Sequence, residues 1–131
     1  MEETVAMRKP IVVAPEQGRT YEMGRMRAIF KADLEESAHR YSVSEWWLEP
    51  GTRGPGVHQH GEDHVFYVIA GSLSVWVSEH WSHLAKGAYV VIPGETPHNF
   101  ENQGTERAGW VGLSHVGSIH AAPRLPIGHA A

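Results

Sequence analysis

Residues 51–71 read GTRGPGVHQHGEDHVFYVIAG and join two kinds of sequence pattern. The first half is rich in glycine and proline, which mark turns. The second half is a run of β-branched and aromatic residues that ends at Gly71, as expected for a strand. Three histidines, His58, His60 and His64, lie between the two halves. The stretch therefore predicts a turn and two strands, with imidazole side chains where they meet.

Strand and turn signals alternate in the same way along most of the chain. Only residues 33–40 have a helical pattern, and they are long enough for a single helical turn. Many short strands at regular spacing indicate an antiparallel sandwich or barrel. We expect strands, each rich in Val, Ile, Trp, Tyr or Phe, at residues 11–14, 23–31, 41–48, 58–60, 65–70, 73–78, 89–92, 98–101 and 108–115.

The length and composition of the chain indicate one globular domain. Its 131 residues suffice for one hydrophobic core and are too few for two ordinary domains. The hydrophobic fraction of 41% and charged fraction of 20% are those of a soluble protein. We expect a single domain over residues 1–131, with a core at about 20–116. Residues 117–131 contain Pro123 and Pro126 without periodicity, and we expect them to form a loose tail.

Several classes of function are disfavoured by what the sequence lacks. The net charge is −4 and the basic residues form no cluster, so we expect no binding to nucleic acid. The chain has no cysteine, which excludes disulfides, thiolate catalysis and cysteine ligation of zinc. No apolar run approaches the roughly 18 residues of a membrane span, and the N-terminus lacks the apolar stretch of a secretory signal. We therefore expect a cytoplasmic protein that does not bind membranes.

The spacing of the histidines points to a metal site. His58 and His60 are two residues apart, so on a strand both rings face the same side. His98 follows the rigid bend PGETP at residues 93–97. If neighbouring antiparallel strands bring His98 beside His58, His60 and His64, the four imidazoles can converge on one ion. A single histidine would be read as an ordinary polar residue, and we read the six others of the chain that way.

Two segments resemble the sequence motifs of the cupin superfamily. The first, residues 51–71, contains a glycine, His-x-His, an acidic residue shortly after and a closing glycine. The second runs from residue 87 to residue 102 and contains Gly87, Pro93, His98 and Asn102. Both motifs occur at the separation found in the family. The chain departs from the family pattern at two positions, with His64 in place of the metal-binding acid and Glu95 in place of a glycine.

This resemblance implies an all-β fold, the double-stranded β-helix or jelly-roll cupin barrel, with a bound metal. The metal ligands implied are His58, His60, His64 and His98, a four-histidine variant of the family's site. Glu62 stays open as a fifth or substitute ligand, because it shares a strand face with His60 and His64 if no bulge intervenes.

Four neutral imidazoles leave a divalent ion with its full positive charge. Such a site favours anionic ligands, for example an enolate, a catecholate or a carboxylate. Imidazole suits Fe, Mn, Ni, Cu and Zn alike, so the sequence predicts one divalent transition metal without selecting it. Because imidazole takes up a proton near pH ~6.5, we expect metal affinity to fall in acid.

Strand alternation outlines a pocket beside the histidines. If His64 faces the barrel interior, Phe66 does too, and Phe100 follows His98 in the same way. These two rings either contact a small substrate or simply fill the core. Trp46 is a further candidate for the pocket wall, although a shift of one residue would exchange it with Trp47. Glu62 could serve as a general base, or remain a solvated carboxylate.

The resemblance is to small single-domain cupins such as quercetin dioxygenase and diketone-cleaving enzymes. It implies a metal-dependent oxygenase that acts on a small enolisable or phenolic substrate with O2. Two alternatives remain open at this point. One is a non-redox, metal-dependent isomerase or lyase, and the other is a cupin that binds a small ligand without turnover. Cupins of this size often dimerise and the chain has five tryptophans, so we expect a homodimer.

Overall fold

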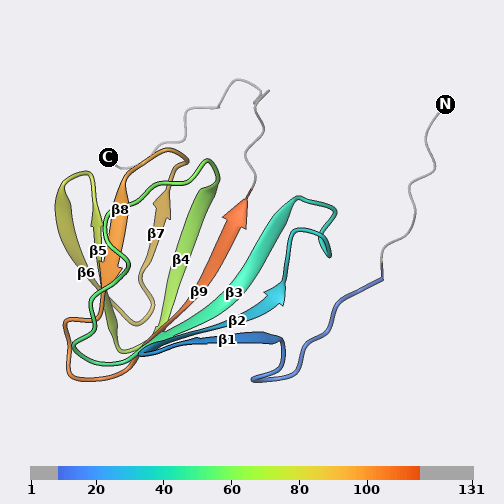
Figure 1. The fold of residues 1–131 in the computed structure, drawn as a ribbon, viewed down its shortest axis with the longest axis horizontal. Coiled ribbons are helices and arrows are strands. Elements are labelled where there is room, and N and C mark those ends of the chain that lie inside the picture. Colours follow the sequence, from blue (N-terminus) through green and yellow to red (C-terminus); the bar gives the residue numbers. More distant parts are fainter. Residues whose placement is uncertain (1–8, 116–131) are drawn as a thin grey trace.

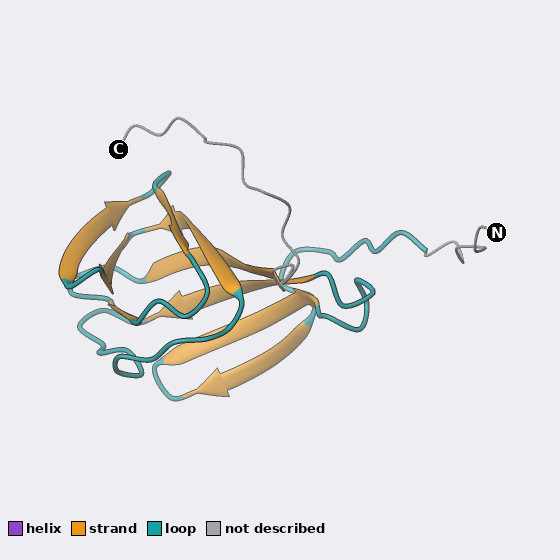
Figure 2. Ribbon diagram, turned by 90° about the horizontal axis from the view of Figure 1, so that it is seen from above, coloured by secondary structure: helices purple, strands orange, loops and turns teal. Residues whose placement is uncertain are grey.

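Residues 9–115 of the computed structural model form two antiparallel β-sheets that face each other (Figures 1 and 2). The smaller sheet has the order β6 (His80–Ala85), β5 (Ser72–Val77) and β8 (His98–Glu101). The larger sheet has the order β1 (Arg19–Met23), β2 (Met26–Ala32), β3 (Tyr41–Leu48), β9 (Ala108–His115), β4 (Asp63–Ala70) and β7 (Tyr89–Ile92). The predicted all-β jelly-roll fold is confirmed.

The core lies between the sheets and is built by strand alternation. Side chains two residues apart on a strand point to the same face, so alternate positions of each central strand meet across the gap. Both sheets contribute large apolar residues, and Trp110 of β9 is only 1% exposed. The main cluster comprises Leu48, Phe66, Val68, Leu73, Val75, Ile92, Phe100 and Trp110. Aromatic rings dominate the half of this core that adjoins the histidines.

Tight turns at glycine connect the strands where the chain changes sheets. Gly71 joins β4 to β5 with a φ of 63°, a value that favours glycine. A Cβ atom there would lie 2.3 Å from the carbonyl oxygen of Arg107. Any other residue would therefore both strain the backbone and collide with the start of β9.

The structure corrects three of the predicted strands. Residues 11–14 form no strand, although they are apolar. Residues 23–31 do not form one continuous strand, because Gly24, at a φ of 67°, reverses the chain between β1 and β2. Residues 58–60 contain a single bridge, from His58 to His98, in place of a strand.

Two further differences concern exposed segments. β6 was not predicted, because nearly all its side chains are exposed and show no alternation of burial. It is held by backbone pairing with β5, including Trp81 opposite Trp76. Residues 33–40 form a series of turns without a helix. The side chains of Asp33 and Glu36 each accept a hydrogen bond from the other's backbone N–H, at 2.9 Å, which stabilises the first of these turns.

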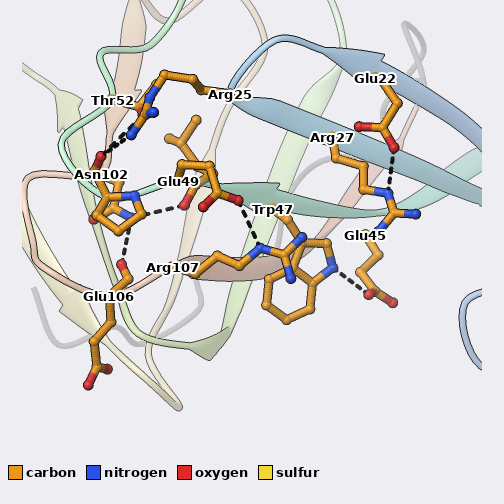
Figure 3. Close-up of polar contacts among 12 residues, drawn as sticks. Glu22, Arg25, Arg27, Glu45, Trp47, Glu49, Thr52, Asn102, Glu106 and Arg107 are labelled. Carbon is orange, nitrogen blue, oxygen red and sulfur yellow. Dashed lines mark hydrogen bonds and ion pairs between the residues drawn. The ribbon is translucent and has the colours of Figure 1, made fainter.

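Asn102, the last residue of the second motif, ties two segments together (Figure 3). Its side-chain amide donates to the carbonyl oxygens of Leu48 at 2.9 Å and Glu106 at 2.8 Å. Its side-chain oxygen accepts from the N–H of Gly104 at 2.9 Å. A buried amide that makes all three bonds fixes the end of β3 against the connection from β8 to β9.

The predicted tail at residues 117–131 lies outside the described residues. Within residues 9–115 the structure contains no helix that is long and apolar enough to cross a membrane.

Candidate metal centre

The four histidines reach one end of the barrel from different parts of the chain. His64 is the second residue of β4, in the larger sheet, and His98 is the first residue of β8, in the smaller sheet. His58 and His60 lie in the connection from β3 to β4. Two backbone hydrogen bonds, of 3.0 and 2.8 Å, join His58 and His98 and hold this connection along the edge of β8. Both sheets therefore contribute to the cluster.

The four rings are mutual neighbours. The ring centroids of His58 and His98 are 4.4 Å apart, and those of His58 and His60 are 4.9 Å apart. The distance from His60 to His64 is 4.6 Å, and that from His64 to His98 is 5.9 Å. The predicted ligands thus lie close together at one end of the barrel.

Hydrogen bonds at Nδ1 determine which ring nitrogen can bind a metal. Nδ1 of His58 lies 2.7 Å from the carbonyl oxygen of Gly56, and Nδ1 of His98 lies 2.8 Å from that of Thr96. A carbonyl oxygen only accepts, so Nδ1 carries a proton in both rings, and the neutral form of each has its lone pair on Nε2. Bonds of this kind orient metal-binding histidines in proteins. The chemistry and protonation of these side chains therefore fit a divalent transition metal.

Distances between potential ligand atoms divide the cluster into two overlapping groups. The nitrogens of His58, His60 and His98 lie within 4.8 Å of one another. A ring nitrogen of His60, a ring nitrogen of His64 and a carboxylate oxygen of Glu62 also lie within 4.8 Å of one another. His60 is common to both groups, and Glu62 adjoins the His64 side of the cluster. Either set offers at least three ligands of the types that hold a transition metal.

Burial and mutual repulsion keep two of the rings neutral. The pKa of His64 is lowered to about 4, mainly by burial and then by the neighbouring imidazoles of His60 and His98. The pKa of His98 is also lowered, again mainly by burial. A neutral imidazole is the form that binds a metal. The protonation states of these two rings thus suit a cation site.

A cavity of about 420 Å³ opens directly beside the histidines. The sequence-predicted residues Phe66, Phe100 and Trp46 all line it, and Phe66 is in edge-to-face contact with Phe100 at 6.1 Å. Trp47, the alternative to Trp46, points to the opposite face, where Arg107 lies 4.6 Å above its ring (Figure 3). The alternation in β3 therefore places Trp46 on the cavity side.

Several residues of this region were not singled out from the sequence. Ser42, Ser44, Ser114 and Met26 line the cavity, and the hydroxyl of Ser114 lies 3.4 Å from Nδ1 of His64. The signal that could have found Ser44 and Ser42 is their place two and four residues before Trp46 on one strand, because alternate residues face the same side. Trp110 also lines the cavity, and its buried Nε1 has no hydrogen-bond partner among the described residues.

The turn before His98 is anchored to the other motif. The carboxylate of Asp63 accepts a hydrogen bond from the N–H of Gly94 at 2.8 Å. Glu95 has a φ of 66° and donates its N–H to the carbonyl oxygen of His60. Its side chain accepts a bond from Gln59 at 3.1 Å. Asp63 is therefore a positioning residue that holds the two histidine-bearing segments together.

Comparison with known proteins identifies the family. The model of the cupin domain matches residues 44–114, more than half of the chain. This chain belongs to the cupin family. The match spans both motifs and all four clustered histidines. The resemblance inferred from the two motifs is confirmed.

Solved structures of cupins have the same fold. An RmlC-like cupin from Shewanella frigidimarina is 18% identical, with a TM-score of 0.69 over 87% of this chain and 98% of that one. A predicted oxalate decarboxylase from Thermotoga maritima is 16% identical, with a TM-score of 0.74 over 80% of this cupin and 98% of that chain. KdgF from Halomonas sp. is 16% identical, with a TM-score of 0.69 over 82% and 94% of the two chains. At this identity the likeness shows the fold alone. No curated protein matches the sequence.

Proposed function

We propose that this cupin is a metal-dependent oxygenase that acts on a small enolisable or phenolic substrate. Support comes chiefly from one observation. Nδ1 of both His58 and His98 is hydrogen-bonded to a backbone carbonyl oxygen, which leaves Nε2 free, and both rings line a substrate-sized apolar cavity. Rings oriented in this way are suited to metal binding, and the adjoining cavity is suited to a small molecule.

His58, His60, His64 and His98 would hold the metal, and Glu62 either adds a ligand or serves as a base. A bound divalent transition metal supplies Lewis acidity and, when it is redox-active, reactivity toward O2. The chain's own part is to position the substrate and to move a proton. A carboxylate oxygen of Glu62 lies within 4.8 Å of ring nitrogens of His60 and His64, although Glu62 does not line the cavity. From the histidine side it would accept the proton of a metal-bound enol or phenol hydroxyl and leave the substrate anionic. Phe66 and Phe100 would flank the apolar part of the substrate and exclude water.

Oxygen consumption tests the proposal directly. The metal-free protein is reconstituted separately with Fe(II), Mn(II), Ni(II) and Cu(II), and oxygen uptake is recorded with a flavonol, a 1,3-diketone, a catechol and an enediol. We expect uptake with at least one pair. The variant His98→Gln should lose both metal and activity, whereas His80→Gln, which changes an exposed histidine of β6, should keep both.

The outcomes separate the candidate functions. Absence of oxygen uptake with every metal and substrate would contradict an oxygenase. Conversion of a substrate by the Zn(II) protein under nitrogen would instead assign a non-redox isomerase or lyase. Stoichiometric ligand binding without conversion in either atmosphere would assign a binding protein.

We also propose that the protein acts in the cytoplasm and as a homodimer. Support for the homodimer comes from an apolar outer face of the larger sheet, and its test is given in the Discussion.

A further inference from the structure

We infer that the cavity selects a ligand that is polar at one end and apolar and uncharged at the other. This inference rests on the proposed metal centre, but it does not rest on oxygen chemistry. It names the class of substrate that the site accepts and the class that it rejects, among molecules with the same metal-binding head.

The register of the strands arranges the cavity wall in layers of decreasing polarity. At the level of the histidines, Ser42 pairs with Ser114, and Ser114 pairs with His64. At the next level Phe30 pairs with Ser44, and Phe66 pairs with Gly112. Polar side chains are thus concentrated at the metal end of the larger sheet, and aromatic rings begin one step further along the strands.

The far end of the cavity is apolar. One level beyond Ser44, Trp46 pairs with Trp110, and the two rings stack at 6.1 Å. The indole N–H of Trp46 is directed to the hydroxyl of Ser44 at 2.7 Å, so that polar group is already satisfied within the chain. Met26 and Met23 complete this end of the wall. A ligand group placed here meets thioethers, aromatic faces and the neutral N–H of Trp110, which has no partner among the described residues.

No aspartate, glutamate, lysine or arginine side chain lines the cavity within residues 9–115. The arginines of β1, β2 and the turn between them are engaged elsewhere. Arg19 pairs with Asp33, Arg25 donates to Thr52 at 2.7 Å, and Arg27 pairs with Glu22 at 3.0 Å (Figure 3 shows the last two contacts). A second anionic group on the ligand would therefore be buried without a counter-charge, and this is strongly unfavourable.

Two probes with the same metal-binding head test the inference. The protein is loaded with Zn(II) under nitrogen, metal content is measured, and binding is followed by calorimetry and by quenching of tryptophan fluorescence. The probes are 4-ethylcatechol and 3,4-dihydroxybenzoate, which differ in carrying an ethyl group or a carboxylate opposite the hydroxyls. We expect the ethyl compound to bind at least about 30-fold more tightly, since the carboxylate must be desolvated without a partner.

A cation added at the apolar end should reverse the preference. Met26→Lys places an ammonium group there, and Met23→Lys does the same from the more exposed β1, so that one variant remains if the other fails to fold. Both should improve binding of 3,4-dihydroxybenzoate and weaken that of 4-ethylcatechol. Val12→Lys adds the same charge at a residue that is 92% exposed and does not line the cavity, and it should change neither.

Equal binding of the two probes to the zinc-loaded protein, tighter binding of the carboxylate, or binding of neither would overturn the inference. Oxygen uptake plays no part in this measurement. A failed oxygenase assay would therefore leave the binding preference standing, and equal binding would leave the oxygenase proposal untouched.

Discussion

His64 lies where burial and the neighbouring imidazoles disfavour its protonated form, which lowers its pKa to about 4. In the unfolded chain the same group has a pKa of ~6.5. Between these two values the unfolded state binds a proton that the folded state does not. Above pH ~6.5 the imidazole of His64 does not affect how stability depends on pH. As the pH falls toward 4, its protonation in the unfolded state must decrease the free energy of unfolding.

The metal-free protein should therefore lose stability in mild acid relative to His64→Gln. We expect the difference in free energy of unfolding between the two proteins to change by about 1 kcal/mol between pH 7.5 and pH 5, after allowance for partial exposure of the ring. Urea denaturation in the presence of a chelator measures it, with His80→Gln as the control. A difference that is the same at both pH values would contradict the lowered pKa of His64.

Gly109 is required by the ring of Trp47, which packs on it from the outer face. A Cβ atom at Gly109 would lie 2.4 Å from the Cζ3 atom of Trp47. The ring cannot easily move, because its N–H donates to Glu45 at 2.6 Å and Arg107 lies over its other face. We expect Gly109→Ala to cost about 1–3 kcal/mol of stability. In a Trp47→Ala background the same substitution should cost much less, and an unchanged cost would show that the clash is not with Trp47.

At the scale of elements, Asn102 connects the end of β3 to the segment between β8 and β9. Asn102→Asp keeps the acceptor but loses both donors, so the carbonyl oxygens of Leu48 and Glu106 are left without their partner. We expect a loss of about 2–3 kcal/mol, because unsatisfied buried groups carry the full cost of desolvation. The urea midpoint measures it, with the exposed neighbour Gln103→Ala as the control. A loss no larger than that of Gln103→Ala would contradict the role assigned to Asn102.

Strand alternation in the sequence was sufficient to predict the strands of the core, whose buried and exposed faces differ. It failed where that difference is absent. β6 is exposed on nearly every side chain, and residues 11–14 are apolar but have no strand to pair with in the described structure. The hairpin at Gly24 was missed because a single glycine between two strand-like segments does not show whether the chain bends or continues.

The histidine cluster was predictable because its residues follow the spacing of two known motifs. The polarity of the cavity was not, because it depends on which residues of separate strands lie at the same level. Ser42 and Ser114 are 72 positions apart in the sequence and become neighbours only through the pairing of β3 with β9. The choice between Trp46 and Trp47 likewise depended on register, which local sequence does not determine.

At the scale of the whole molecule, one face of the larger sheet has the character of an interface. Alternation places seven apolar residues on its outer side, and three of them, Tyr67, Tyr89 and Val91, are 47–63% exposed. The set comprises Val43, Val65, Tyr67, Tyr89, Val91, Val111 and Leu113. Glu45, opposite Val111, lies on the same side and accepts the N–H of Trp47 at 2.6 Å. The seven apolar residues of this outer apolar face allow two copies to pack through it around a two-fold axis.

We therefore expect a homodimer in solution. Size-exclusion chromatography with light scattering should give twice the mass of the 14.5 kDa chain. Tyr67→Glu combined with Val91→Glu should yield a monomer, because two like charges would then face their copies across the axis. The control Val12→Lys should leave the dimer intact. A monomeric wild-type protein, or a dimer that is unaffected by the double substitution, would exclude this face as the interface.

His64 belongs to one sheet and His98 to the other, so an ion held between them acts as a cross-link between the two layers of the barrel. The two sheets can then separate at this end only when the ion is released. A free metal concentration above the dissociation constant therefore raises the free energy needed to separate the two sheets. Chelation should accordingly loosen the contact between the two sheets at the histidine end of the cavity.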